Sequence, residues 1–361
     1  MEAERRDIVI VGGGLAGAGL ACMLRGSGLK VALLEAVGGP RAAPPGYDER
    51  GLVLSPASRR ILTALGLWEA LAGAACPVEH IHVSERGRFA FTHLSAAGEG
   101  VDALGHVVRA RAIGEALQAG LEGEPDLDWV APARVTAVEP EAGGMTVRAA
   151  TDAGERCFHA RLLVVADGAA SPSRRMLGVE VEEKDYGQVA VVCSLTPGRP
   201  HRNTAFERFT ETGPLALLPQ REGHCVCVNT VAAGEAEAVL ALEDKAYLAQ
   251  VQERFGYRLG RLRRPGRRSS YPLRLVWARR QVGPRWVLLG NAAHAIHPNA
   301  AQGLNLALRD AAALAEGLWQ AARSGADPGR SELLDAYRAA REPDQKRIRC
   351  LSDGLATLFY N

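Results

Sequence analysis

Three glycines near the start of the chain have the spacing of a nucleotide-binding turn. Gly12, Gly14 and Gly17 follow an apolar run at 7–11 and precede an alanine- and leucine-rich stretch that extends to Gly28. In such a turn the first glycine permits a sharp bend, the second lets a pyrophosphate approach the backbone, and the third lets the helix pack on the strand. A purely structural glycine turn is the alternative interpretation.

Glu35 narrows the choice of nucleotide. It ends the second apolar run, 30–34, so the first part of the chain reads as one βαβ unit. A carboxylate at this position accepts hydrogen bonds from ribose hydroxyls and disfavours a 2′-phosphate. The glycines and Glu35 therefore predict tight binding of FAD or NAD and do not choose between them.

Two further polar clusters each follow an apolar run. The segment 167–174 (DGAASPSR) comes directly after the run 161–166, and Gly290 and Asn291 come directly after the run 285–289. Ligands of open α/β sheets bind at the carboxyl ends of the strands. We therefore expect both clusters to face the same ligand as the first glycines.

The elements that must position these motifs are of two types. Apolar runs typical of buried strands occur at the start, middle and end of the chain, and alternating apolar and polar residues dominate between about 185 and 275. These patterns predict a discontinuous Rossmann-like α/β domain with an inserted, mostly antiparallel β domain. Helices are expected at 58–72, 111–121, 244–255, 303–320 and from 331 onward.

Composition excludes several classes of protein. Lysine and arginine outnumber aspartate and glutamate by only 43 to 41, which does not indicate a nucleic-acid-binding surface. The seven cysteines include no C-x-x-C pair, so neither a disulfide framework nor a zinc site is indicated. His294 and His297 have a metal-ligand spacing, but we expect no carboxylate pair or cysteine beside them and hence no metal. The sequence shows neither a leader pattern nor a long apolar run, and we expect a cytoplasmic protein.

Taken together, these motifs resemble the group A FAD-dependent aromatic hydroxylases, which share the p-hydroxybenzoate hydroxylase fold. The resemblance covers essentially the whole chain, including 297–305 and Asp310, which are similar to the family pattern H-P-x-x-G-Q-G-x-N-x-x-x-x-D. It implies an FAD-binding domain formed by 1–75, 101–177 and 277–345 and a substrate domain formed by 76–100 and 178–276. Residues 346–361 would begin a C-terminal helical segment that continues further in the resembling hydroxylases.

The family resemblance also implies which residues contact the cofactor. The first glycines would hold the ADP half of FAD, the D-G pair at 167–168 would bridge FAD and NAD(P)H binding, and the helix that begins near Gln302 would aim its positive N-terminus at the flavin. Two departures stand out, because Asn291 replaces the usual aspartate and Ala301 replaces a usual glycine. The implied cofactor-binding residues are Gly12, Gly14, Gly17, Glu35, Arg50, Arg111, Asp167, Gly168, Gly290, Asn291, Gln302, Gly303 and Asn305.

Within this family, the segments 47–51, 205–219 and 271–273 resemble the ubiquinone-biosynthesis hydroxylases, and most closely the 2-octaprenyl-6-methoxyphenol hydroxylases. This implies hydroxylation of the aromatic ring of a polyprenylated phenol with NAD(P)H and O2, through a C4a-hydroperoxyflavin. Arg50 and Pro298 would lie near the flavin and the substrate. The flavin performs the chemistry, so no nucleophile is assigned, and the sequence identifies no base for the phenol. Alternatives are another FAD-dependent oxidoreductase and a non-catalytic flavin-binding subunit of a ubiquinone-biosynthesis complex.

A basic segment in the second half of the chain has several interpretations. From Phe255 to Arg285 there are ten arginines and no acidic residue. The segment is either a solvated face, a binding surface for the phosphates of NADPH, or a contact with anionic lipid. The last interpretation predicts a peripheral position on the inner membrane, where a polyprenylated substrate is available.

Overall fold

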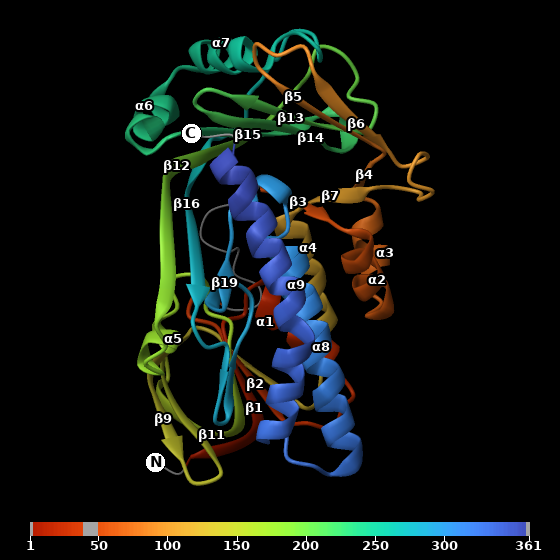
Figure 1. Ribbon diagram of the computed structural model, residues 1–361. Helices are drawn as coiled ribbons and strands as arrows, with labels where there is room; N and C mark the ends of the chain where they lie inside the picture. Colours follow the sequence, from red (N-terminus) through yellow and green to blue (C-terminus); the bar gives the residue numbers. More distant parts are fainter. Residues whose placement is uncertain (1–2, 39–49, 359–361) are drawn as a thin grey trace.

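The computed structural model describes residues 3–38 and 50–358, which form two eight-stranded sheets and one small sheet (Figure 1). The first sheet has the strand order β17-β18-β11-β1-β2-β8, and its central strands run parallel. Its strands are β1 (Glu4–Val11), β2 (Val31–Leu34), β8 (Leu127–Val130), β11 (Gly154–Val165), β17 (Val282–Gly283) and β18 (Trp286–Leu288), with β9 (Ala133–Glu141) and β10 (Gly144–Thr151) attached antiparallel to β11. The apolar runs of the sequence are therefore the buried strands of one parallel sheet.

Both faces of this first sheet are covered, which explains why its strands are apolar throughout. Ile8 and Ile10 point into a core shared with the helices, whereas Val9 and Val11 point into a core shared with β9 and β10. The helices that contribute to the first core are α1 (Leu15–Met23), α2 (Pro56–Ala64), α3 (Trp68–Ala72), α4 (Ala110–Leu121), α8 (Gly303–Ser324) and α9 (Ser331–Leu358). On the other side, α5 (Pro172–Met176) packs near β9.

The second sheet is mostly antiparallel and has the order β19-β16-β12-β15-β14-β13-β5-β6. Its strands are β5 (His80–Glu85), β6 (Phe91–Ser95), β12 (Val181–Leu195), β13 (Thr204–Thr210), β14 (Gly213–Pro219), β15 (Cys225–Ala232), β16 (Ser269–Ala278) and β19 (His294–Ala295). Two helices, α6 (Ala236–Ala241) and α7 (Asp244–Phe255), pack on its outer face. The long strands β12 and β16 connect this sheet to the rest of the molecule (Figure 1).

The inner face of the second sheet packs against the small sheet, which has the order β3-β7-β4. The small sheet consists of β3 (Gly51–Leu54), β4 (Cys76–Val78) and β7 (Gly105–Arg109), and the 3-10 turns are η1 (Arg221–Gly223), η2 (Ala233–Glu235), η3 (Gly290–Ala292) and η4 (Pro298–Ala300). The predicted architecture is confirmed: a parallel α/β sheet built from separate parts of the chain carries an inserted antiparallel β region.

Three elements differ from the sequence predictions. The helix expected at 58–72 is two helices, because Gly66 adopts a φ of +73° that ends α2. The strand β11 begins well before the apolar run at 161–166: its first part pairs antiparallel with β10, and it continues parallel to β1. Helix α9 also runs without a break through Pro343, so the predicted division after residue 345 falls inside one helix.

None of the helices in the described ranges combines the length and the apolar character that a bilayer-spanning segment requires.

Candidate active site

The glycine turn between β1 and α1 has three positions with three different environments. Gly12 has a φ of +105°, and a Cβ added there would overlap the carbonyl oxygen of Ala166, the residue that follows β11. A Cβ at Gly17 would overlap the carbonyl oxygen of Gly12. A Cβ at Gly14, by contrast, would meet no described atom within 4 Å. Gly12 and Gly17 are thus required by close packing, while Gly14 faces open space that a pyrophosphate can approach.

Glu35 closes one side of this turn. Its carboxylate accepts hydrogen bonds from the backbone N–H groups of Gly13, at 2.7 Å, and Val37, at 2.9 Å. Each carboxylate oxygen has a second lone pair, so Glu35 retains capacity to accept hydrogen bonds from ribose hydroxyls. The side chain is therefore held in the position in which the sequence predicts it to bind a nucleotide.

A cavity of about 300 Å³ lies at the carboxyl ends of β1, β2 and β11. Its lining includes Gly12, Gly14, Glu35, Asp167, Gly168 and Ser173 from the predicted nucleotide-binding segments. It also includes Ala133, Arg134 and Val135 at the start of β9, which sequence reasoning did not identify. The glycine cradle, the fixed carboxylate and the open volume beside them fit the adenosine and pyrophosphate parts of FAD.

The segment 167–174 is held as a rigid loop. Ser171 Oγ donates a hydrogen bond to Asp167, and the backbone N–H of Ser173 donates to the same carboxylate at 2.9 Å. Arg174 is 3% exposed and donates to the carbonyl oxygens of Ala292, at 2.8 Å, and Ala169, at 2.9 Å. The guanidinium of Arg174 therefore ties this loop to the loop that follows β18.

The loop after β18 brings Gly290 against two helices. Gly290 has a φ of +60°, and an added Cβ would lie 2.8 Å from the Cβ of Ala16 on α1 and 3.6 Å from that of Ala307 on α8. Asn291, the next residue, is exposed. The close approach at Gly290 requires a residue without a side chain and leaves the Asn291 amide accessible to a ligand.

A buried asparagine in the first turn of α8 holds the start of this helix by hydrogen bonds. Asn305 is 1% exposed; its amide donates to the carbonyl oxygens of Val53 and Ala301 and accepts from Ser55 N–H and Ser58 Oγ at 2.6–2.8 Å. Because its side chain is fully engaged with the protein, any contact of Asn305 with a cofactor must come from its backbone. Its side chain positions the first turn of α8, which begins at Gly303 after Gln302.

Ala301 lies in the turn before α8, at the position where the resembling family has glycine. Its φ of +49° and ψ of 35° are in the left-handed region. Glycine adopts this conformation readily, whereas an alanine pays on the order of 1 kcal/mol. The structure thus gives the physical reason for the family's glycine and shows that this chain adopts the same turn with alanine.

Three other predicted residues lie outside the cavity. The Arg50 guanidinium lies over the ring of Tyr271 on β16, 4.8 Å from its centroid, and so sits where the first domain meets the second sheet. Arg111 Nε, on α4, lies 3.8 Å from Glu115 Oε1. Pro298 is exposed at the start of η4. The predicted residues therefore do not all line one cavity: Arg50 contacts the second sheet, and Arg111 lies on α4.

Sequence reasoning missed a buried polar network beneath the loop at 290–297. His294 Nε2 lies 2.6 Å from Asp310 Oδ2, and Asp310 also accepts hydrogen bonds from Arg341 at 2.6 Å and Gln345 at 3.0 Å. The sequence did not indicate that a single carboxylate, Asp310, would lie beside His294, because α8 brings it back under the loop. Asp310 belongs to the recognised motif, but nothing in the sequence indicates that α9 supplies its other partners. In the described residues no group of three or more metal-ligating side chains occurs.

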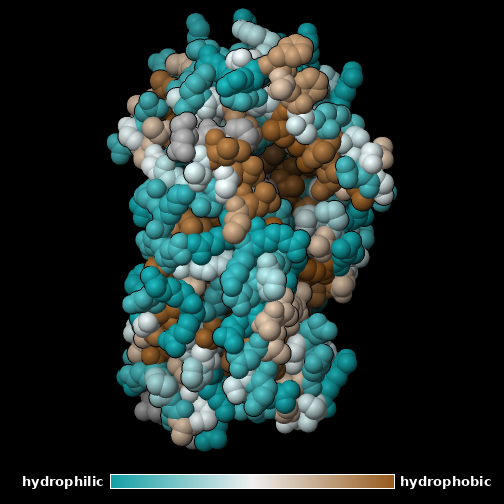
Figure 2. Space-filling view, in the orientation of Figure 1, coloured by the Kyte–Doolittle hydropathy of each residue, from teal (hydrophilic) through white to brown (hydrophobic). Residues whose placement is uncertain are grey.

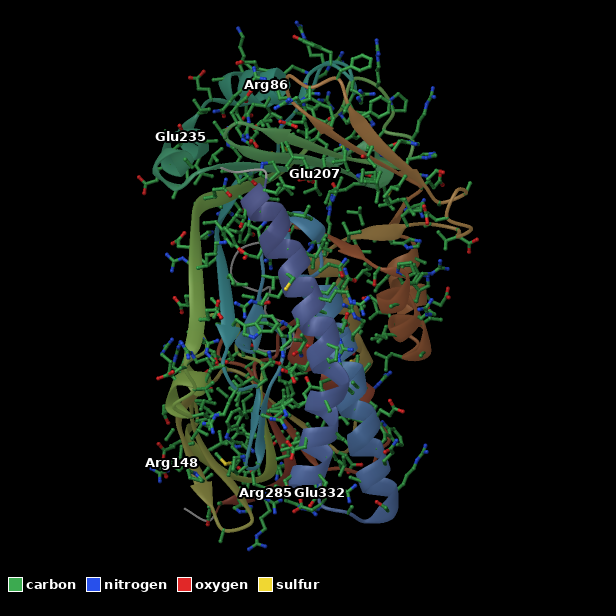
Figure 3. The ribbon with its side chains drawn as sticks, viewed as in Figure 1. Arg86, Arg148, Glu207, Glu235, Arg285 and Glu332 are labelled. Carbon is green, nitrogen blue, oxygen red and sulfur yellow. The ribbon has the colours of Figure 1, made fainter. Side chains whose placement is uncertain are left out.

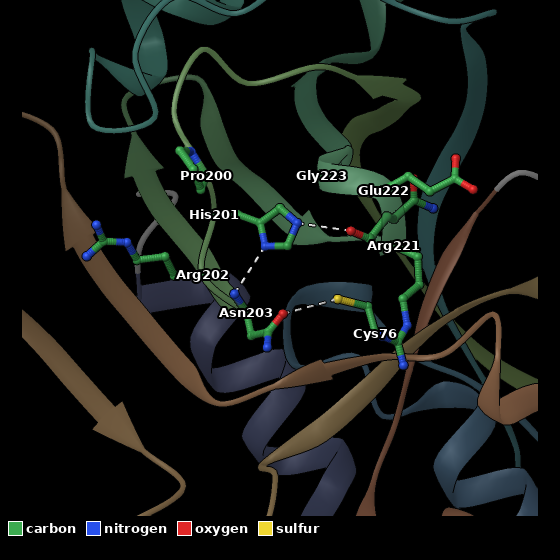
Figure 4. A pocket seen from close by; sticks show the side chains of 9 residues that line it. Cys76, Pro200, His201, Arg202, Asn203, Arg221, Glu222 and Gly223 are labelled. Atoms are coloured by element: carbon green, nitrogen blue, oxygen red, sulfur yellow. Dashed lines mark hydrogen bonds between the residues drawn. The ribbon is translucent and has the colours of Figure 1, made fainter.

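A second cavity, of about 240 Å³, lies where β13 begins and β14 ends (Figure 4). His201 Nδ1 accepts a hydrogen bond from the backbone N–H of Asn203 at 3.1 Å, so its Nε2 donates to the carbonyl oxygen of Gln220 at 2.9 Å. Cys76 Sγ lies 3.6 Å from Asn203 Oδ1. Burial lowers the pKa of His201, which keeps the ring neutral. These contacts account for the side chains as structural, and we assign them no role in cofactor binding.

Comparison with known proteins agrees with this geometry. Residues 5–352 match the FAD binding domain family. The chain is 38% identical over 355 residues to the ubiquinone hydroxylase UbiL of Rhodospirillum rubrum, covering 98% of this chain and 82% of that protein. It is 33% identical to the ubiquinone hydroxylase UbiM of Neisseria meningitidis, covering 92% of this chain and 72% of that protein.

Solved structures share the fold. PqsL of Pseudomonas aeruginosa in complex with 2-aminobenzoylacetate superposes with a TM-score of 0.83 at 24% identity, covering 99% of this chain and 97% of that chain. The p-nitrophenol 4-monooxygenase PnpA of Pseudomonas putida superposes with a TM-score of 0.80 at 19% identity, covering 99% of this chain and 89% of that chain. The protein therefore belongs to the FAD-binding-domain family and, within it, to the ubiquinone hydroxylases, which makes it an FAD-dependent monooxygenase.

Proposed function

We propose that the protein hydroxylates the aromatic ring of a polyprenylated phenol in ubiquinone biosynthesis. FAD, reduced by NAD(P)H, supplies the activation of O2. The observation that carries the proposal is that the molecule combines the nucleotide cradle with an apolar hollow that suits a prenylated ring. The names of the relatives UbiL and UbiM support the substrate class.

The apolar hollow lies between the second sheet and the small sheet. Figure 2 shows it as a recess of hydrophobic residues in the upper half of the molecule. Where the two sheets meet, apolar side chains pack together in a core cluster, among them Val53 and Val107 from the small sheet and Ile81 and Leu218 from the second sheet. The last turns of α9, which carry the exposed Leu351, end beside it (Figure 1). Such walls bind a hydrophobic substrate and exclude water from the reacting atoms.

The residues of the cradle have separate roles in this proposal. Backbone at Gly12 and Gly14 and the carboxylate of Glu35 bind the adenosine diphosphate part of FAD. Gly290 and Asn291 bind the central part of the cofactor. The first N–H groups of α8, at Gly303, place positive potential where the reduced flavin ring carries negative charge.

The test is turnover with purified, FAD-loaded protein and short-chain prenylated phenols, in air and under nitrogen. NAD(P)H consumption and the mass of the product are measured together. A product heavier by one oxygen atom, formed only in air, supports the proposal. Equal NAD(P)H-dependent conversion of the phenol under nitrogen would overturn it in favour of a dehydrogenase or reductase on the same fold.

We further propose that the outer edge of the second sheet contacts an anionic membrane surface. Arg258, Arg261, Arg263, Arg264 and Arg267 are exposed after α7. Three aromatic side chains near them are also exposed: Phe89 (100%), Phe91 (62%) and Tyr257 (67%). Exposed arginine and aromatic side chains together are typical of surfaces that bind anionic lipid headgroups.

The aromatic and basic residues of this surface lie close together. The rings of Phe91 and His82 are 5.1 Å apart, and the pKa of His82 is lowered by burial and by the charge of Arg258. The hairpin of β5 and β6 and the segment after α7 therefore form one surface. A polyprenylated substrate resides in lipid, so this surface would bring the hollow next to its source.

Binding to vesicles tests this contact. We expect the protein to sediment with vesicles of phosphatidylglycerol and phosphatidylcholine and not with phosphatidylcholine alone. Each arginine near the surface contributes about 1 kcal/mol, so the charge reversal Arg264→Glu, which changes the charge by two, should weaken binding by roughly thirtyfold. The matched control is Arg148→Glu, on the opposite end of the molecule in Figure 3. Equal binding to both kinds of vesicle would contradict the proposal.

A further inference from the structure

Glu207 is a carboxylate on the inner face of the second sheet, the face that borders the apolar hollow. Side chains of a strand alternate between the two faces. Phe206 points outward, where its ring meets that of Phe255 on α7 at 5.6 Å, and Ala205 points inward, into the cluster with Val53 and Val107. Glu207 therefore points inward, as Ala205 does, and Figure 3 labels it at the middle of this sheet.

The neighbours of Glu207 across the sheet are small and apolar. Glu207 lies opposite Ala216 on β14 and Val83 on β5. The same row continues with Val228 on β15 and Val192 on β12. A single carboxylate thus interrupts a row that otherwise provides a flat, hydrophobic wall. This is where a hydrophobic ring would lie against the second sheet.

Nothing in the described residues compensates the charge of Glu207. Within the described residues, 3–38 and 50–358, no hydrogen-bond donor or cation contacts its carboxylate, and its pKa is shifted by burial alone. The Glu207 side chain is half-buried on this face, and a carboxylate that is partly removed from water without a partner destabilises a protein. Residues of this kind cluster at functional sites, where a ligand supplies the missing partner. The missing partner of Glu207 is a hydrogen-bond donor inside an apolar hollow, which describes the hydroxyl group of a phenol.

We propose that Glu207 is the catalytic base of the hydroxylation: it binds the phenolic hydroxyl of the substrate and accepts its proton. The inference rests on the proposed function and adds the residue that the sequence did not identify. Burial raises the pKa of Glu207 to about 8, which brings it closer to the value of about 10 for a phenol. The smaller the gap between the two pKa values, the more easily the proton is shared.

The proton transfer has a defined balance. The phenolic O–H bond breaks, its proton bonds to the Glu207 carboxylate, and the electron pair stays on the phenol oxygen and enriches the ring. A ring carbon then forms a bond to one oxygen atom of O2, whose reducing equivalents come from NAD(P)H. The hydrogen of that carbon leaves as a proton to the second oxygen atom, which is released as water. The proton on Glu207 returns to the phenolate, so the carboxylate ends as it began.

Glu207→Gln keeps the size of the side chain and removes its basicity. With saturating phenol, the wild-type turnover rate should rise with pH as the Glu207 and phenol pair loses its first proton. The variant should lose this rise and turn over about 100-fold more slowly or worse, since general base catalysis contributes about 100-fold to 10,000-fold. Its FAD content and its rate of flavin reduction by NAD(P)H should match those of wild type.

The matched control is Glu235→Gln, which makes the same chemical change at an exposed position near α6, far from the hollow (Figure 3). It should retain the wild-type rate and pH profile. Wild-type rate and pH profile in Glu207→Gln, alongside normal turnover by the wild-type protein, would overturn the assignment of Glu207 and leave the proposed function standing.

Ligand binding tests the contact without turnover. The quenching of FAD fluorescence in the oxidised protein reports binding of a prenylated phenol and of its methyl ether, which lacks the donated hydrogen. Wild type should prefer the phenol by about tenfold at alkaline pH, and Glu207→Leu should lose this preference because its side chain accepts no hydrogen bond. An unchanged preference in Glu207→Leu would refute the contact. Absence of turnover in the wild type would instead count against the proposed function, and the binding result would still decide the role of Glu207.

Discussion

Two regions of the molecule are formed in different ways: the nucleotide cradle around Gly12, Gly14 and Glu35, and the inner face of the second sheet around Glu207, which we call the substrate wall. In the cradle, Gly12, Gly14 and Gly17 are neighbours in sequence, and backbone groups and a fixed carboxylate provide the binding surface. On the wall, Glu207 and its neighbours belong to strands that meet only through sheet register. The geometry of the glycine turn is therefore a local property of the chain, whereas the proposed substrate wall depends on long-range pairing.

The two regions also differ in how polar groups are satisfied. Asp167, Asn305 and Asp310 each accept hydrogen bonds from several protein groups around the cradle. Glu207 has no such partner in the described residues. The cradle is thus rigid before the cofactor binds, while the wall is complete only when a substrate supplies a donor.

The largest expected effect distinguishes Gly17, which is needed for packing of α1, from Gly14, which faces the nucleotide site. Gly17→Ala places a Cβ on the carbonyl oxygen of Gly12, so α1 must move, and we expect a loss of stability on the order of 4 kcal/mol. Gly14→Ala meets no described atom and should leave the apoprotein as stable as wild type while weakening FAD binding. Thermal unfolding of the apoprotein and FAD titration measure the two effects. Similar apoprotein stability in both variants would contradict this division.

The second prediction concerns the network under the cradle. Asp310→Asn removes the charge that faces the largely buried Arg341, and breaking such a pair should cost on the order of 3 kcal/mol. The control is Asp335→Asn, whose pair with Arg338 is more than half exposed and should contribute less than about 1 kcal/mol. Urea unfolding measures both variants. Equal losses would mean that Asp310 contributes no more than a surface ion pair.

The sequence predicts the cradle well because its motifs are short and follow strands. Gly12 to Gly17, the segment 167–174 and Gly290 each stand at the end of an apolar run, and the ends of parallel strands must meet at one edge of the sheet. The partners of Asp310 were not predictable in the same way. Arg341 and Gln345 lie on another helix, and helix periodicity does not indicate which helix a polar side chain will face.

Glu207 was not predictable for a related reason. It stands in a segment whose resemblance to ubiquinone hydroxylases was recognised, yet the sequence alone does not fix which face of β13 packs on the helices. A shift of one residue in register would place Glu207 outside the hollow. Only the observed pairing with Ala216 and the outward position of Phe206 identify its face.

The third prediction concerns acid stability at the loop before α8. Burial lowers the pKa of His297 to about 4, and its neutral Nδ1 accepts a hydrogen bond from Asn299 N–H at 3.2 Å. Below about pH 6.5 the unfolded chain binds a proton at this position and the folded protein does not, so stability falls as the pH falls toward 4. Between about pH 7 and about pH 5, the free energy of unfolding of His297→Gln should therefore fall by about 2 kcal/mol less than that of wild type.

Urea unfolding at the two pH values measures this difference. The control is His93→Gln, at an exposed position on β6, which should show the same loss of stability as wild type. If the stability of His297→Gln falls as much as that of wild type, other groups cause the acid sensitivity.

The smallest expected effect is a gain in stability at the substrate wall. The pKa of Glu207 is raised to about 8 in the folded protein, so the folded state binds more protons than the unfolded chain between the ordinary glutamate value and about pH 8. The stability tied to this proton is present at acid pH and is lost as the pH rises through about 8, where folding must bury a charge. Glu207→Gln carries no charge. Because the Glu207 side chain is only half-buried, solvent screens most of the roughly 5 kcal/mol that the full pKa shift implies, so at about pH 9 the variant should be more stable than wild type by about 1 kcal/mol, and at about pH 5 by much less. Thermal unfolding at the two pH values provides the measurement, with Glu235→Gln as the control that should shift at neither. A variant that gains stability at alkaline pH while losing turnover would show that the protein keeps an unfavourable carboxylate for its chemistry. Equal shifts at both pH values would mean that the position of Glu207 on β13 does not raise its pKa.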